Sequence, residues 1–182
     1  MLSLALHQTA RFPTDPATNT PVLRPKERIE HLISGLSKDK AIIVIPAPAL
    51  AEFLTVVENA GPQYIQQIDR SARFQIEPFD TMAAIEAAQM YRALKARGDW
   101  RGGATGDKQK VKVDQQIVAI AITRQALPIY TADTDIIKTC QALSLPCVAV
   151  WELPLPAEDP QQKLFTDEEL RAKRAIDLKH SE

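Results

Sequence analysis

Short apolar runs alternate with longer helix-like segments along most of this chain, and this alternation restricts the folds that it can adopt. The apolar runs are expected to form strands and lie at 41–46, 74–79, 127–133 and 146–153. Helices are expected at 25–36, 47–61, 62–72, 80–98, 111–126 and 134–143. Strands that alternate with helices predict a parallel sheet with helices on both faces. We therefore expect a three-layer α/β/α fold with a central parallel sheet.

The remaining segments are connections and a tail. The stretch 13–25 is rich in proline and turn-forming residues, which predicts an irregular connection. A chain of 182 residues fits one domain, which we place at 1–155. The polar tail, 156–182, is expected to form an exposed helix, because Thr166 and Glu169 match a capping box.

Charge and composition exclude several classes of protein. The formal net charge of -1 excludes a uniformly basic nucleic-acid binder, although local basic patches stay open. No apolar run approaches the roughly 18 residues of a membrane span. The first residues lack the pattern of a signal peptide, so we expect a cytoplasmic protein. Cys140 and Cys147 match neither a disulfide framework nor a metal-ligand spacing, and we expect buried thiols.

Acidic residues occur where the strands of such a sheet should end. Glu52 lies in the first turns of the helix after "AIIVIP", Asp114 lies near the start of the helix before "PIYT", and Asp133 and Asp135 follow that strand. Each carboxylate alone is explained by a helix N-terminus, which favours negative charge. Together they are the oxygen ligands that Mg²⁺ or Mn²⁺ requires, and clustered carboxylates repel one another unless a cation compensates them.

The motifs around these acids resemble those of the PIN-domain nucleases. The resemblance rests on "PAPALAEFL", "KVKVDQQIVAIAI" and "LPIYTADTDI", which stand in the family's order, and it covers roughly residues 1–155. It implies that Glu52, Asp114 and Asp133 are catalytic residues and metal ligands, with Asp135 as a further acid. It also implies one or two divalent ions, Mg²⁺ or Mn²⁺, and hydrolysis of a phosphodiester, usually of RNA. Thr131 resembles the family's small hydroxyl residue, and as a β-branched residue it equally suits a strand.

The family's first motif, a strand that ends in aspartate, has no counterpart in this sequence. The segment "LSLAL" resembles the start of the helix that follows this strand, so the aspartate is expected just before Met1. The strand itself is expected between the segments 42–45 and 128–131. We therefore favour a truncated sequence of an active nuclease. If the chain is complete, the metal site lacks a principal ligand and we expect weak or absent catalysis.

Basic residues gather just before Asp114. Arg101, Lys108, Lys110 and Lys112 lie in or next to a loop that contains glycine, and they could hold the phosphates of a nucleic acid. Trp100 in the same loop could stack on an unpaired base. The alternative is a solvated basic loop.

These observations leave two main functional hypotheses. The first is a metal-dependent endoribonuclease, in size similar to the toxin of a toxin–antitoxin pair, with RNA, an antitoxin and a second copy of the chain as expected partners. The second is a catalytically impaired nucleic-acid-binding or scaffold protein, because the first acidic motif is missing. A receiver-like phosphotransfer domain, which also binds Mg²⁺, fits less well, since the strand-end acid pair and the lysine that it needs are arranged differently.

Overall fold

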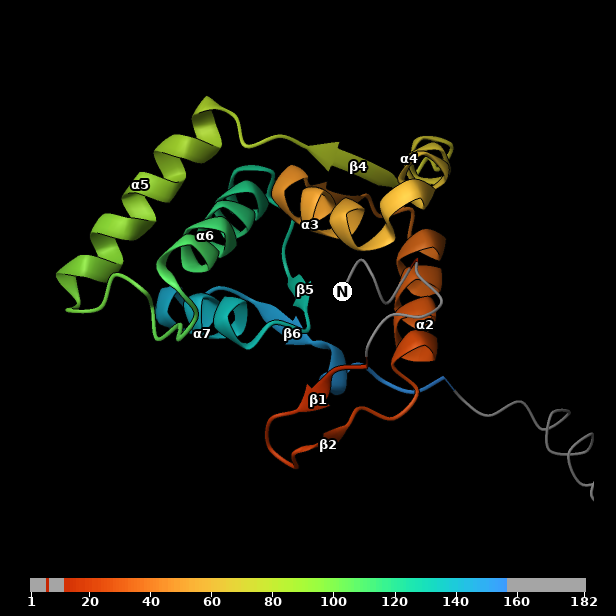
Figure 1. Ribbon diagram of the computed structural model, residues 1–182, viewed down its shortest axis with the longest axis horizontal. Helices are drawn as coiled ribbons and strands as arrows, with labels where there is room; N and C mark the ends of the chain where they lie inside the picture. Colours follow the sequence, from red (N-terminus) through yellow and green to blue (C-terminus); the bar gives the residue numbers. More distant parts are fainter. Residues whose placement is uncertain (1–5, 7–11, 157–182) are drawn as a thin grey trace, which may run out of the picture.

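The computed structural model describes residue 6 and residues 12–156 (Figure 1). The expected tail helix therefore lies outside the described residues, as does most of the segment "LSLAL". The described part is a mixed α/β fold, which confirms the expected class. None of its helices has both the length and the apolar character that crossing a bilayer demands.

The proline-rich connection contains two short strands that the sequence did not predict. β1 (Thr14–Asp15) pairs with β2 (Thr20–Pro21) in an antiparallel ladder. The Asp15 carboxylate accepts a hydrogen bond from the Ala17 N–H at 2.8 Å, and this local bond closes the turn between the strands. α2 (Pro25–Lys38) follows, with its proline in the first turn as expected.

The next unit contains the first pair of parallel strands. β3 (Ile43–Pro46) leads into α3 (Ala47–Val57), a 3-10 turn (Glu58–Ala60) and α4 (Gly61–Asp69), and then into β4 (Phe74–Glu77). β3 and β4 pair in parallel, with Ile45 opposite Ile76. The buried face of α3 packs on this pair through Leu50, Phe53 and Val57.

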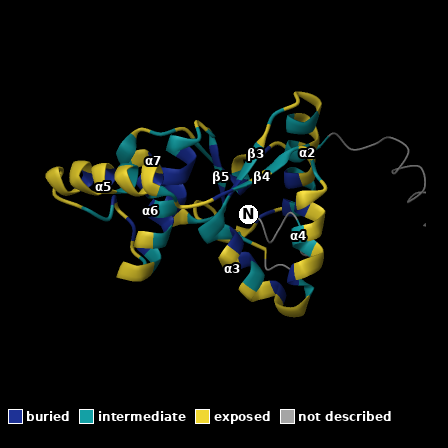
Figure 2. Ribbon diagram, turned by 90° about the horizontal axis from the view of Figure 1, so that it is seen from above, coloured by how far each residue is buried: buried dark blue, intermediate teal, exposed yellow. Residues whose placement is uncertain are grey.

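Two long helices come next, and both begin at an aspartate cap. α5 (Thr81–Ala96) corresponds to the predicted helix 80–98, is capped by Asp80 and leaves an exposed outer face (Figure 2). α6 (Lys108–Thr123) begins three residues earlier than the predicted 111, because the Asp107 carboxylate accepts hydrogen bonds from the N–H groups of Gln109 and Lys110. The lysine-rich first turn of α6 has no apolar periodicity, which is why the prediction missed it.

The last unit contains the second pair of parallel strands. β5 (Ile129–Thr131) leads into α7 (Thr134–Leu143) and then into β6 (Cys147–Ala149), with Ile129 opposite Cys147. β6 is shorter than the predicted strand, because a 3-10 turn (Val150–Glu152) follows it directly. Cys140 is fully buried as expected, whereas Cys147 is only partly buried.

The arrangement of the strands differs most from the prediction. The described strands form separate two-stranded sheets, and no three-layer sandwich is present among the described residues (Figure 1). Ile43 donates its N–H to Arg73 in the first pair, and Ile129 donates its N–H to Pro146 in the second. Because backbone groups alternate in direction along a strand, those of Val44 and Tyr130 face away from their paired strands. Both residues line a cleft between β3 and β5.

Candidate metal centre

Three aspartates meet beside this cleft. Asp114 comes from the second turn of α6, whereas Asp133 and Asp135 come from the start of α7, just after β5. One carboxylate oxygen from each lies within 4.8 Å of the other two, close enough for all three to hold a metal ion. The structure thus brings together three of the four acids that the sequence singled out.

Asp133 both caps a helix and presents an oxygen to the cluster. Its Oδ1 accepts a hydrogen bond from the Asp135 N–H at 2.8 Å, which caps α7. Its Oδ2 faces the Lys110 ammonium at 2.9 Å. The buried Thr131 hydroxyl accepts a hydrogen bond from the Asp133 N–H at 3.0 Å, so Thr131 positions the backbone of this turn.

Asp135 is anchored to the loop before α6. Its carboxylate accepts hydrogen bonds from the Thr105 N–H at 2.9 Å, the Thr105 hydroxyl at 3.3 Å and the Gly106 N–H at 3.0 Å. Burial acts to raise the pKa of Asp135, but these N–H groups and the Lys110 ammonium outweigh it and lower the pKa to about 2. Asp135 is therefore ionised across the physiological range and holds the loop against α7.

Lys110 places its ammonium in the middle of the aspartate cluster. Its Nζ lies 2.8 Å from Asp114 Oδ2, 2.9 Å from Asp133 Oδ2 and 3.4 Å from Asp135 Oδ2. Partial burial acts to lower the pKa of Lys110, but the hydrogen bonds to Asp114 and Asp133 prevail and raise it. The ammonium occupies the position of the cation that these carboxylate oxygens would bind. The three aspartates therefore suit a metal ion.

Asp114 is the most confined acid of the cluster. Burial raises its pKa, the Lys110 ammonium opposes that shift, and the charges of Asp133 and Glu52 add to it. A divalent cation would remove this repulsion, because it favours the ionised form of each carboxylate.

Glu52 stands apart from the three aspartates. Its side chain is exposed on α3, in the unit that contains β3, although it lines the same cleft as Asp114 and Asp133. Its negative charge contributes to the raised pKa of Asp114, after burial and the charge of Asp133. Glu52 is thus near the cluster, but it is not among the residues whose oxygens converge.

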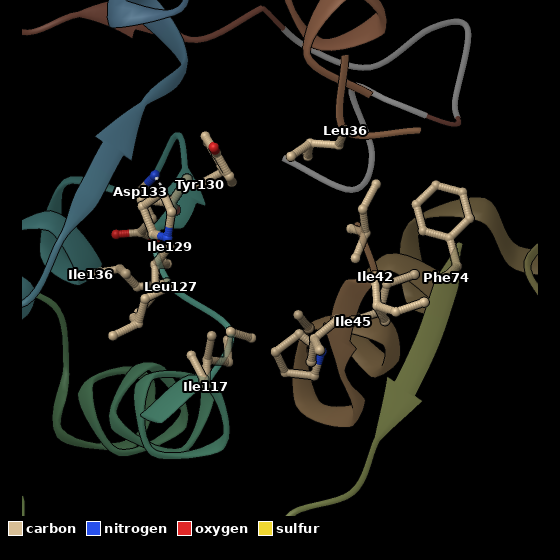
Figure 3. A pocket seen from close by; sticks show the side chains of 18 of the residues that line it. Leu36, Ile42, Ile45, Phe74, Ile117, Leu127, Ile129, Tyr130, Asp133 and Ile136 are labelled. Atoms are coloured by element: carbon tan, nitrogen blue, oxygen red, sulfur yellow. Dashed lines mark hydrogen bonds between the residues drawn. The ribbon is translucent and has the colours of Figure 1, made fainter. Parts of the chain in front are cut away.

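The cleft beside the cluster is mainly apolar and encloses about 560 Å³. Figure 3 shows Ile42, Ile45 and Phe74 on one wall, facing Ile117 and Ile129 on the other. The carboxylates of Glu52, Asp114 and Asp133 supply the acidic groups of its lining. The cleft therefore joins an apolar surface to the candidate metal centre.

The predicted phosphate-binding residues have different surroundings. Lys108 and Lys112 are exposed on α6, as a substrate-binding role requires, whereas Lys110 is engaged by the aspartates. The Arg101 guanidinium donates a hydrogen bond to the Gly106 carbonyl at 2.7 Å and lies 5.1 Å from the centre of the Trp100 ring. Arg101 and Trp100 therefore also stabilise the loop.

Two parts of this centre were not predicted from the sequence. The contact between Lys110 and Asp114 has the i, i+4 spacing of a helical ion pair, and that spacing could have revealed it. The bonds from Thr105 and Gly106 to Asp135 join segments about thirty residues apart, and no local pattern signals them.

Comparison with known proteins adds no family to this description. No protein-family model matches the chain, and no curated protein matches it.

Proposed function

We propose that this chain is a metal-dependent endoribonuclease that hydrolyses RNA phosphodiester bonds, with Mg²⁺ or Mn²⁺ held by Asp114, Asp133 and Asp135. The observation that carries the proposal is the convergence of these three carboxylates on one position that already holds a positive charge. Carboxylate oxygens in a cleft form the ligand set that hard divalent ions prefer. Glu52 is the further acid of the proposed site.

The proposed fold is a PIN-like three-layer arrangement. It is supported by the order of the acidic motifs and by the cleft, which lies between β3 and β5. The family places its central strand between the corresponding segments, 42–45 and 128–131. The apolar walls suit a strand in this position, as do the backbone groups of Val44 and Tyr130, which face away from their paired strands.

Each residue of the proposed site has a part in binding or orientation. The metal, when bound, supplies Lewis-acid chemistry by polarising the phosphoryl group and lowering the pKa of water. Asp114, Asp133 and Asp135 would offer it their oxygens. Thr131 and the α7 cap fix the orientation of Asp133. Asp135 holds the loop that leads into α6. Lys108 and Lys112 can contact RNA phosphates from the exposed side of that helix.

The proposed cellular context follows from the same resemblance. RNA is the substrate, and an antitoxin protein or a second copy of the chain is a further partner of this proposed cytoplasmic nuclease. A toxin role predicts that expression of the active chain arrests growth and that Asp114→Asn relieves the arrest.

Two observations favour a second candidate function, that of a non-catalytic nucleic-acid-binding or scaffold protein. The Lys110 ammonium already compensates the cluster, and Glu52 lies outside it. A protein of this kind would bind RNA without cleaving it.

An RNA cleavage assay with matched variants separates the two functions. The nuclease should cleave single-stranded RNA in Mg²⁺ or Mn²⁺, stop in EDTA and lose at least about 100-fold in rate as Asp114→Asn, because a metal ligand is lost. Asp69→Asn is the control, since Asp69 is exposed at the end of α4. Cleavage that persists in EDTA would refute the metal mechanism, and RNA binding without cleavage would favour the scaffold.

A further inference from the structure

The position of Lys110 has a consequence for how the cluster can take up a metal. Its ammonium lies within 3.4 Å of an oxygen of each aspartate, which places it among the atoms that would coordinate the ion. Mg²⁺ in proteins lies roughly 2.1 Å from its oxygen ligands. An ion so close to the same oxygens would meet the ammonium at a distance where two cations repel strongly.

We propose that Lys110 is a resident counter-cation that a divalent metal must displace, so that metal binding and the ion pairs of Lys110 exclude each other. This inference rests on the proposed metal centre. Lys110 is then a positioning residue, because it keeps three carboxylates together in the absence of metal. Lys110 also lowers the affinity of the centre for metal, compared with the same three aspartates without a competing ammonium.

The surroundings of Lys110 allow the exchange. Its side chain is 38% exposed, whereas those of Asp114 and Asp135 are 4% and 7% exposed. The lysine therefore reaches the cluster from the solvent side, and its ammonium can return to water when a metal replaces it. Once a metal supplies the compensating charge, the burial of Asp114 and Asp135 and the bond from the Asp135 N–H to Asp133 keep the ligands in place.

Other cations near the cluster do not duplicate this role. Lys138 approaches Asp135 Oδ1 at 3.7 Å, on the oxygen that Thr105 also contacts. Lys112 lies on the same helix as Lys110 and is exposed. Lys112→Met therefore removes the same charge from α6 without removing the ammonium from the cluster, and it is the matched control.

The first test is calorimetric titration of the full chain with Mn²⁺. Lys110→Met should bind Mn²⁺ about tenfold or more tightly than Lys112→Met, because the competing charged hydrogen bonds are gone. Binding that is no tighter in Lys110→Met than in Lys112→Met overturns the inference. Circular dichroism establishes that each variant is folded.

The second test uses the wild-type chain and does not depend on the folding of a variant. Acetic anhydride should acetylate Lys110 slowly without metal and several-fold faster with saturating Mn²⁺, with Lys112 as the internal control, because the Lys110 nitrogen is held among the carboxylates until a metal releases it to solvent. Equal labelling of Lys110 with and without Mn²⁺ overturns the inference.

The outcomes also separate this inference from the proposed function. Mn²⁺ binding that is lost in Asp114→Asn but not strengthened in Lys110→Met overturns only the role of Lys110. Mn²⁺ binding that is unchanged in Asp114→Asn, or absent from both wild type and Lys110→Met, overturns the metal centre and the inference with it.

Discussion

Replacement of Asp135 by asparagine should destabilise the chain even when no metal is present. Asparagine has one side-chain oxygen instead of two, so its NH2 group would face the backbone N–H of Thr105 or Gly106. Two donors would then meet, and one hydrogen bond would be lost. The ion pair with Lys110 at 3.4 Å would also be lost. Asp135→Asn therefore tests whether this acid stabilises the loop before α6.

The pKa of Asp135 sets the size of the effect. Lowering this pKa from its usual 3.8 to about 2 corresponds to about 2.5 kcal/mol of folding free energy at neutral pH. For a chain of this length, that loss lowers the melting temperature by about 5 to 10 °C.

The same pKa gives the direction of the pH dependence. Asp135 has a lower pKa in the folded chain than in the unfolded chain, so its contribution is fully present above about pH 4 and is lost as the pH falls through about 2. The pKa of Asp114 is raised in the folded chain, so its contribution to stability changes with pH in the opposite direction. Protonation of Asp114 removes the cost of burying its negative charge. The difference between wild type and Asp135→Asn isolates the contribution of Asp135.

Urea unfolding followed by circular dichroism at pH 7 and between pH 4 and 2 measures this difference. Asp99→Asn is the control, because Asp99 also accepts N–H bonds from its own loop but is exposed to solvent. The stability gap should be large for Asp135→Asn at pH 7 and should close toward pH 2. A gap that is absent at pH 7, or that stays constant down to pH 2, would refute the reasoning.

Three further substitutions test the loop beside the centre, the cap of α5 and the basic start of α6. Gly106→Ala should cost about 1 to 3 kcal/mol in chemical unfolding, because its Cβ would lie 2.9 Å from Asp135 Oδ2, and unchanged stability would contradict this. Asp80→Ala should lower the melting temperature by about 2 to 4 °C, since the Ala83 N–H loses its cap, and an unchanged value would dispute the cap. Lys108→Gln should weaken RNA binding and reduce the slope of log affinity against log salt by about one, whereas an unchanged slope would exclude a phosphate contact.

Local signals in the sequence predicted the helices well. The predicted helix 80–98 is α5, which begins at the Asp80 cap, and the predicted helix 47–61 contains α3, which buries Leu50, Phe53 and Val57 at helical spacing. These features depend on residues a few positions apart, which a sequence pattern can show. The first turn of α6 was missed because its cap, Asp107, precedes lysines rather than apolar residues.

Long-range contacts were only partly predictable. The meeting of Asp114, Asp133 and Asp135 follows from the expected arrangement of strands and helices, and the structure confirms it. The pairing of strands depends on edges distant in sequence, and here it gives two separate pairs instead of the predicted sheet. The i, i+4 spacing indicates the pair of Lys110 with Asp114, whereas the contacts of Lys110 with Asp133 and Asp135 cross to another helix and have no local signal.

The separation of the two strand pairs also makes the site adjustable in a mechanical sense. Glu52 belongs to the unit of β3 and α3, whereas Asp133 and Asp135 belong to the unit of β5 and α7, and the cleft lies between these units. A small change in the width of the cleft would therefore move the glutamate toward or away from the aspartates without disturbing either strand pair. The occupant of the cleft would then determine how many carboxylates can bind the same ion.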